Sequence, residues 1–206
     1  MRKRRFLTLV SFAVLVYALY ASVLLSAVPK YLVLFNGLNL ATTEPEKTGD
    51  WLFYPLPRKL YLAYWEFSRF QECSYLFQDK KDSYVTFLSQ SLLLNPKSVG
   101  VLLDKEQAKI ILNRLIRQGC SVNEPSSETG ILPIHVAVVF GDNDPQVAYL
   151  IAENGPDLNA QVPERGTPYS GKNAKEILSE LLKKKPEDST LIRMRTIFSR
   201  ITRVGS

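Results

Sequence analysis

The sequence predicts a mainly α-helical protein, in which an N-terminal transmembrane helix precedes an aromatic-rich helical cap and a short array of helical repeats. Three observations lead to this fold class: an uncharged apolar run at the N-terminus, a dense group of aromatic residues after it, and a pattern that recurs after 36 residues in the second half. The predicted segments are a basic tip and anchor at residues 1–29, a linker at 30–50, the cap at 51–82 and the repeats at 83–203.

The N-terminal segment joins a basic cluster to an apolar run. Arg2, Lys3, Arg4 and Arg5 precede residues 6–28, which carry no charge. A helix of this length, at about 1.5 Å per residue, crosses a hydrocarbon core of about 30 Å. By the positive-inside rule the N-terminus is cytoplasmic. We therefore expect a signal-anchor, a single-pass location in the inner membrane and a periplasmic C-terminal domain.

Two other interpretations of the apolar run stay open. A cleaved signal peptide usually has a shorter apolar region of roughly 7–15 residues and a small-x-small cleavage pattern, and the small residues Ala21, Ser26 and Ala27 do not form one. A buried core helix is less typical, because soluble cores seldom use so long a charge-free run. The four N-terminal cations account for most of the net charge of +6, so the charge does not indicate a nucleic-acid partner.

The composition restricts the chemistry. At 46% hydrophobic residues the chain can bury a core. One histidine and two cysteines cannot supply a tetrahedral His/Cys zinc site, and we expect no metal and no cofactor. We find no nucleophile elbow or phosphate-binding glycine loop, and the nearest acidic candidate, Glu153-Asn154 near Asp157, lies within the repeat pattern. The sequence predicts no enzyme. Whether Cys73 and Cys120 pair or stay free is left open, since spacing does not give the distance between them.

The segment expected to cap the repeats is rich in aromatic residues. Ten of them fall between Trp51 and Phe77, and Pro57 is placed to begin a helix that runs to about Gln71. A packed capping layer, a membrane-interface surface and a recognition surface all fit this density. Further helices are expected at residues 83–94, ended by Asn95-Pro96, and at residues 105–118, followed by a glycine suited to a left-handed C-terminal cap.

Self-comparison gives the 36-residue pattern. Gly-Cys-Ser-Val-Asn at residues 119–123 matches Gly-Pro-Asp-Leu-Asn at 155–159, and Leu-Pro-Ile-His at 132–135 matches Thr-Pro-Tyr-Ser at 167–170. A period of this length indicates a helical repeat array. These residues resemble the ankyrin repeat, over roughly residues 83–203 and best over 128–160. The chain departs from that family's pattern at residues 141–146, where the turn between helices is longer, and in Tyr-Ser where Leu-His is usual.

Each repeated residue has a physical reason. Pro133 and Pro168 suit the first turn of a helix, and Gly119 and Gly155 permit the positive φ that ends one. The resemblance to ankyrin repeats implies that His135 bridges backbone groups of the loops. The last unit is expected to form two helices, at residues 173–184 and 189–202, with a basic outer face that is either a solvated cap or a patch for anionic lipid.

The resemblance to ankyrin repeats implies a protein-binding function. It places variable recognition positions on the first loop, on the helix that follows and on the next loop, at Glu128, Thr129, Ile131, Val139, Phe140, Pro163, Glu164 and Arg165. We therefore expect a membrane-anchored periplasmic protein-binding module. One version is an immunity protein that neutralises a secreted toxin or effector enzyme. The alternative is a structural or accessory subunit of an envelope membrane complex that binds through its transmembrane and aromatic segments.

Overall fold

The computed structural model describes residues 10–12, 14–21, 23, 40–41, 73–77, 80–94, 101–102 and 105–204. The chain divides into two units, which we describe separately. The first comprises Met1–Asn39 and Glu44–Phe70, and the second comprises Leu40–Thr43 and Gln71–Ser206.

The described residues of the first unit correct the predicted membrane anchor. Residues 10–12, 14–21 and 23 are helical, and most of their apolar side chains are exposed, Phe12 at 68%. Within the part of the chain that the structure describes, no helix is long and apolar enough to cross a membrane. This finding overturns the predicted transmembrane helix and, with it, the predicted single-pass inner-membrane location with a periplasmic domain.

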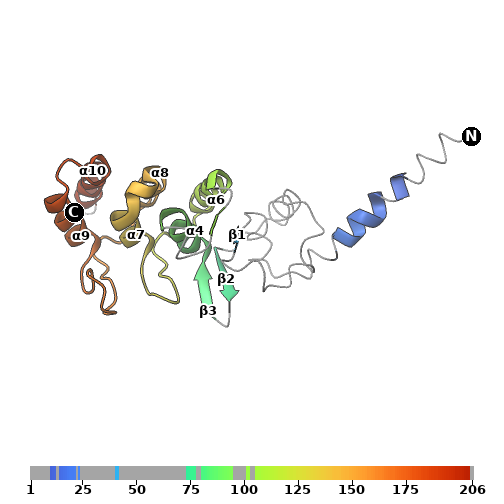
Figure 1. Ribbon diagram of the computed structural model, residues 1–206, viewed down its shortest axis with the longest axis horizontal. Helices are drawn as coiled ribbons and strands as arrows, with labels where there is room; N and C mark the ends of the chain where they lie inside the picture. Colours follow the sequence, from blue (N-terminus) through green and yellow to red (C-terminus); the bar gives the residue numbers. More distant parts are fainter. Residues whose placement is uncertain are drawn as a thin grey trace, which may run out of the picture. The chain divides into compact units, whose positions relative to one another are not determined.

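The described part of the second unit contains three pairs of helices, which follow one another in Figure 1. The first pair is α4 (Tyr84–Leu93) with α6 (Lys105–Arg117), the second is α7 (Pro133–Phe140) with α8 (Pro145–Glu153), and the third is α9 (Ala174–Lys184) with α10 (Ser189–Val204). Helices α4, α7 and α9 pack in one row, and α10 packs on α8 in the other. The mainly helical class agrees with the sequence prediction, as do the positions of α4, α6, α9 and α10.

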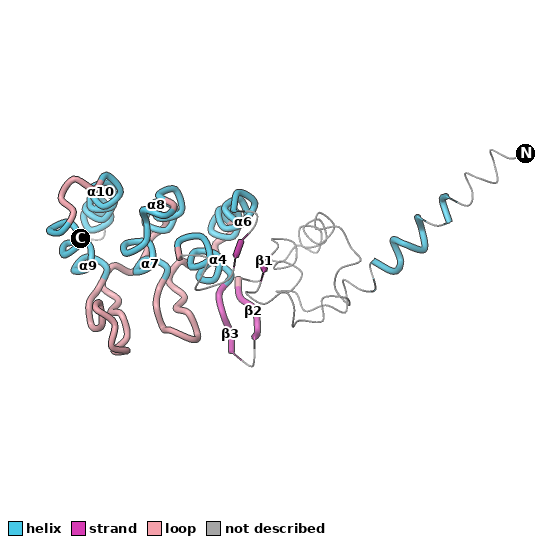
Figure 2. Tube along the Cα trace, viewed as in Figure 1, coloured by secondary structure: helices cyan, strands magenta, loops and turns pink. Residues whose placement is uncertain are grey.

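Short strands accompany the first pair. β2 (Ser74–Phe77) and β3 (Lys80–Ser83) form an antiparallel hairpin, and β1 (Leu40–Ala41) pairs with β4 (Val101–Leu102). The predicted helical cap at 51–82 is therefore wrong for its described part, which is this hairpin. The helix predicted over residues 57–71 lies outside the described residues. Figure 2 shows that the β2–β3 hairpin and the two long loops extend from the same side of the helix pairs.

Helix starts and ends follow from local chemistry. The side chains of Ser83, Asp144 and Asn173 accept hydrogen bonds from backbone N–H groups in the first turns of α4, α8 and α9. Gly119 and Gly155 have φ of 96° and 71°, which confirms the positive φ predicted where α6 and α8 end. The repeated Gly residues therefore mark the same point in two successive units.

The prediction that Pro168 begins a helix is wrong. Thr167–Ser170 form a turn, closed by a hydrogen bond of 3.1 Å from the Ser170 N–H to the Thr167 carbonyl. The loop continues to Asn173, whose side chain and that of Glu176 form a capping box for α9. Proline suits the second position of a turn as well as the first turn of a helix, and here the loop is long enough for the turn.

Buried apolar side chains from all three pairs form one core. Helix α4 contributes Tyr84 and Leu88, and the aromatic ring of Tyr75 in β2 packs 4.9 Å from that of Tyr84. The largest fully buried side chains of the other helices are Ile111, Leu112, Leu115, Ile134, Ile151 and Ile177. No single pair buries both of its faces, so each depends on its neighbours for stability.

A disulfide links Cys73 to Cys120, with the two Cα atoms 5.2 Å apart. It joins the residue before β2 to the residue after Gly119, at the end of α6. Whether the two cysteines pair was left open by the sequence, and they do pair because the hairpin begins beside the end of α6.

Polar contacts also fix the pairs to one another. The Asn123 side chain donates to the Gly155 carbonyl at 3.1 Å and accepts from the Asp157 N–H at 2.7 Å. In the next unit Asn159 accepts from the Lys175 ammonium at 3.1 Å. The Asn residues of the repeated motif therefore connect one unit to the next at the base of the loops.

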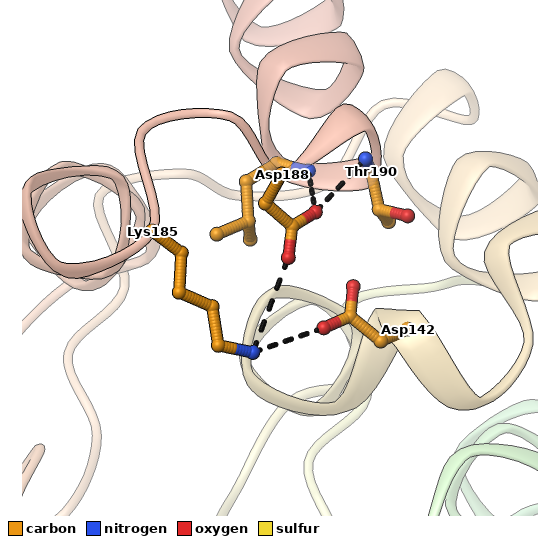
Figure 3. Close-up of polar contacts among 5 residues, drawn as sticks. Asp142, Lys185, Asp188 and Thr190 are labelled. Carbon is orange, nitrogen blue, oxygen red and sulfur yellow. Dashed lines mark hydrogen bonds and ion pairs between the residues drawn. The ribbon is translucent and has the colours of Figure 1, made fainter.

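A second polar link, drawn in Figure 3, lies near the starts of α8 and α10. The Lys185 ammonium lies 3.2 Å from an oxygen of Asp142 and 4.0 Å from one of Asp188. The other oxygen of Asp188 accepts from the backbone N–H groups of Thr190 and Leu191. Lys185 is largely exposed, so this cluster contributes little to stability, and it aligns the turn before α8 with the turn before α10.

Candidate partner-binding cavity

A cavity of about 630 Å³ lies along the row of α4, α7 and α9. Its walls include the first loop (residues 118–132) and the second loop (residues 154–173). The lining residues are Gln90, Leu94, Ser126, Glu128, Thr129, Ile131, His135, Val136, Val139, Phe140, Val162, Thr167, Pro168, Tyr169 and Ile177. All three helix pairs contribute, so the cavity exists only when they are packed together.

Five of the predicted recognition residues line this cavity: Glu128, Thr129, Ile131, Val139 and Phe140. They come from the first loop and from the last turn of α7. Phe140 is 41% exposed, although phenylalanine is usually buried. The structure thus brings these five side chains together around one concave surface.

The first loop is held in shape by its own hydrogen bonds. The Ser126 N–H donates to the Ile131 carbonyl at 3.1 Å, and the Gly130 N–H donates to the Ser126 carbonyl at 2.7 Å. Gly130 has φ of 69°, and a Cβ at this position would lie 2.8 Å from Cγ of Pro163. Glycine is required here by both the backbone angle and the close approach. Glu128, Thr129 and Ile131 are therefore presented from a fixed loop.

The other three predicted residues, Pro163, Glu164 and Arg165, lie on the second loop and do not line the cavity. Pro163 packs against Gly130, and the Arg165 guanidinium donates to the Glu128 carbonyl. The Glu164 carboxylate lies beside Gly171. Pro163 and Arg165 thus connect the two loops, so they hold the cavity wall in place.

The cavity includes residues that the prediction missed. Gln90 and Leu94 lie at the end of α4, and Val162, Tyr169 and Ile177 belong to the third unit. Gln90 and Leu94 are four residues apart, which places them on one face of the helix. This spacing is the sequence feature that could have identified them as cavity residues. That this face is turned toward α7 depends on packing between residues far apart in the sequence.

His135 lies in the cavity wall and is almost completely buried. Its Nδ1 accepts from the Leu132 N–H at 3.4 Å, which leaves Nε2 as the protonated nitrogen that donates to the Ala160 carbonyl at 2.9 Å. Burial lowers the pKa of His135, although the Ala160 carbonyl and the Asp157 carboxylate act in the opposite direction. The imidazole is therefore neutral at pH 7 and joins the first loop to the second.

This arrangement predicts a pH dependence of stability. Because the pKa of His135 is lower in the folded chain than its ordinary value of 6.5, the unfolded chain binds more protons as the pH falls below about 6.5, and stability decreases. The loss stops once the pH is below the folded pKa. We expect the free energy of unfolding in urea to be lower at pH 5.5 than at pH 7.5. His135 is the only histidine, so His135→Gln should remove most of this difference, and an unchanged pH profile would contradict the assignment.

The cavity combines an apolar surface with polar groups at its edge. Leu94, Ile131, Val139 and Phe140 supply the apolar part, while the Glu128 side chain is exposed. The imidazole of His135, which also lines the cavity, makes hydrogen bonds to two backbone groups. Among the described residues no group of three or more His, Cys, Asp or Glu side chains is arranged to hold a metal ion. The apolar wall of the cavity suits the non-covalent binding of an apolar side chain.

The chain matches no family model, no curated protein and no solved structure. The comparisons therefore indicate no ankyrin-repeat family. The resemblance to ankyrin repeats rests on the repeated residues alone.

Proposed function

We propose that this protein is a protein-binding module that uses the cavity along α4, α7 and α9 to hold a partner. The observation that carries the proposal is the exposed side chain of Phe140 beside Val139, at the edge of a cavity built by three consecutive helix pairs. An apolar side chain kept accessible at a concave surface is typical of interaction sites. The resemblance to ankyrin repeats supports the same function.

The cavity suits a partner that inserts one large apolar side chain. Its volume of about 630 Å³ is in the range of ordinary ligand pockets. The apolar wall favours burial of such a side chain, and Gln90 adds a polar side chain to the wall. The hydroxyls of Thr129 and Thr167 also lie in the wall, where each makes a hydrogen bond within its own loop. The fixed first loop reduces the entropy lost on binding.

The predicted immunity function narrows this proposal to one partner class. In that version the partner is a toxin or effector enzyme, and occupation of the cavity accompanies inhibition of that enzyme. A partner that binds at the cavity without any toxic activity supports the binding module and contradicts the immunity version.

The proposal is tested by photo-crosslinking of the full chain. A benzophenone-bearing amino acid is placed at position 140, and in a matched chain at position 110, where Ile110 of α6 is 57% exposed in the other row of helices. We expect a discrete crosslinked protein from position 140 and not from position 110. Equal products from both positions, or a product from position 110 alone, would contradict the proposal.

A further inference from the structure

A second groove lies between α9 and α10, away from the cavity. Its volume is about 870 Å³. It is lined by Lys175, Leu178, Ser179, Leu182, Lys183, Arg195, Phe198, Ser199, Thr202 and Arg203. We call these residues the α9–α10 seam. None of them lines the partner-binding cavity, so the seam is a separate surface.

The two helices contribute to the seam in the same pattern. On α9 the seam residues lie at positions 175, 178, 179, 182 and 183, and on α10 they lie at 195, 198, 199, 202 and 203. Each set has the spacing i, i+3, i+4, i+7 and i+8, which forms a stripe along one helix face. In both stripes a cation stands at each end, a serine is in the middle, and a large apolar residue precedes the serine. The seam is thus a two-turn groove with cations at both ends.

The floor of the seam is apolar and its ends are charged. Leu178 and Phe198 are buried between the helices, whereas Ser179 and Ser199 are exposed and small. Small side chains in the middle of a groove allow another helix to approach closely, and a helix with its side chains is about 10 Å wide. The shape therefore suits a helix better than a flat surface.

The charges of the seam are of one sign. None of the residues that line it carries a carboxylate. Of the two acidic residues of α9, Glu176 caps the helix at Asn173, and Glu180 lies 2.5 Å from the Lys172 ammonium. Lys183 also attracts the Glu180 carboxylate, which does not itself line the seam. Lys175 donates to the side chain of Asn159, which is uncharged. A helix that carries carboxylates about two turns apart is complementary to this pattern of cations.

We propose that the α9–α10 seam binds an acidic amphipathic helix of a partner protein. The helix places apolar side chains over Leu178 and Phe198, and its carboxylates meet the cations at the ends of the seam. Those cations are eight residues apart on each helix, which corresponds to about 12 Å. A second copy of this chain does not fit the same face, because the cations of the two copies would meet.

The test uses the full chain and two synthetic peptides of about 18 residues. Both carry leucines in a helical stripe, and one has glutamates flanking the stripe at eight-residue spacing where the other has lysines. Fluorescence anisotropy is expected to show binding of the glutamate peptide alone, weakened by added salt. The Lys183→Glu, Arg195→Glu double variant should bind it at least about tenfold more weakly.

A matched control has the same charge change outside the seam, in the Lys184→Glu, Arg200→Glu double variant. It should bind the glutamate peptide as the natural chain does, and both double variants should retain the circular dichroism of the natural chain. Failure of the glutamate peptide to bind, binding of both peptides alike, or equal losses in the two double variants would overturn the proposal. Binding to vesicles of anionic lipid without binding to the glutamate peptide would also overturn it, and would assign the seam to a membrane surface.

Discussion

Replacing Cys73 and Cys120 together by alanine is expected to lower the free energy of unfolding by about 4 kcal/mol. The disulfide joins residues 47 positions apart, and closing a loop of this length reduces the entropy of the unfolded chain by about that amount. In the folded chain the bond holds the start of the β2–β3 hairpin at the end of α6. The measurement is equilibrium unfolding in urea without reductant, with the free energy extrapolated to zero denaturant.

Reduction provides the control for this prediction. A thiol reductant should lower the stability of the natural chain to about that of the double alanine variant, and it should leave the variant unchanged. Two free thiols per chain in the unreduced, denatured protein would contradict the bond. A double variant as stable as the natural chain would contradict the stabilisation attributed to it.

The helices were predictable where local chemistry determines them. The apolar stripe of α6 and the glycine after it gave its position, and the asparagine at 173 gave the start of α9. The positive φ of Gly119 and Gly155 followed from their place after the helices. These features depend on residues within a few positions of one another.

The elements that the sequence did not reveal depend on distant residues. The β2–β3 hairpin replaces part of the predicted helical cap, because the aromatic density that Tyr75 and Phe77 share with the residues before them does not reveal the pairing of β2 with β3. The disulfide could not be predicted because it depends on the β2–β3 hairpin lying beside the end of α6. Pro168 suits the first turn of a helix and also the second position of a turn, so the sequence does not distinguish the two. The positive φ of Gly166 and Gly171 shows how the longer second loop is accommodated.

The candidate cavity was predictable in part for the same reason. Glu128, Thr129 and Ile131 lie on one loop, and Val139 and Phe140 end the helix that follows, so the repeat pattern identified them together. Gln90 and Leu94 belong to the preceding unit, and Tyr169 to the next, and only the packing of α4, α7 and α9 adds them. The roles of Pro163 and Arg165 in joining the loops likewise depend on their contacts with Gly130 and Glu128.

Replacing Val139 and Phe140 together by glutamine is expected to weaken partner binding by at least about 30-fold. Both side chains line the cavity, and Phe140 is 41% exposed, so its apolar surface is available to the partner. Loss of an apolar anchor residue at an interface commonly costs about 2 kcal/mol or more in binding. Glutamine preserves helix propensity, so the free energy of unfolding should decrease by less than about 1 kcal/mol. Ile110→Gln on α6 is the matched control for an apolar to polar change in the other row of helices.

The central claim, that the cavity along α4, α7 and α9 holds the partner, is tested most directly by pull-down with these chains. The full chain, the Val139→Gln, Phe140→Gln variant and the Ile110→Gln variant are each used to recover the protein that crosslinks at position 140, with thermal unfolding recorded for all three. We predict that the natural chain and Ile110→Gln recover it equally, and that the double variant does not, although it remains folded. Undiminished recovery by the double variant, equal loss in Ile110→Gln, or collapse of the fold in the double variant would contradict the claim.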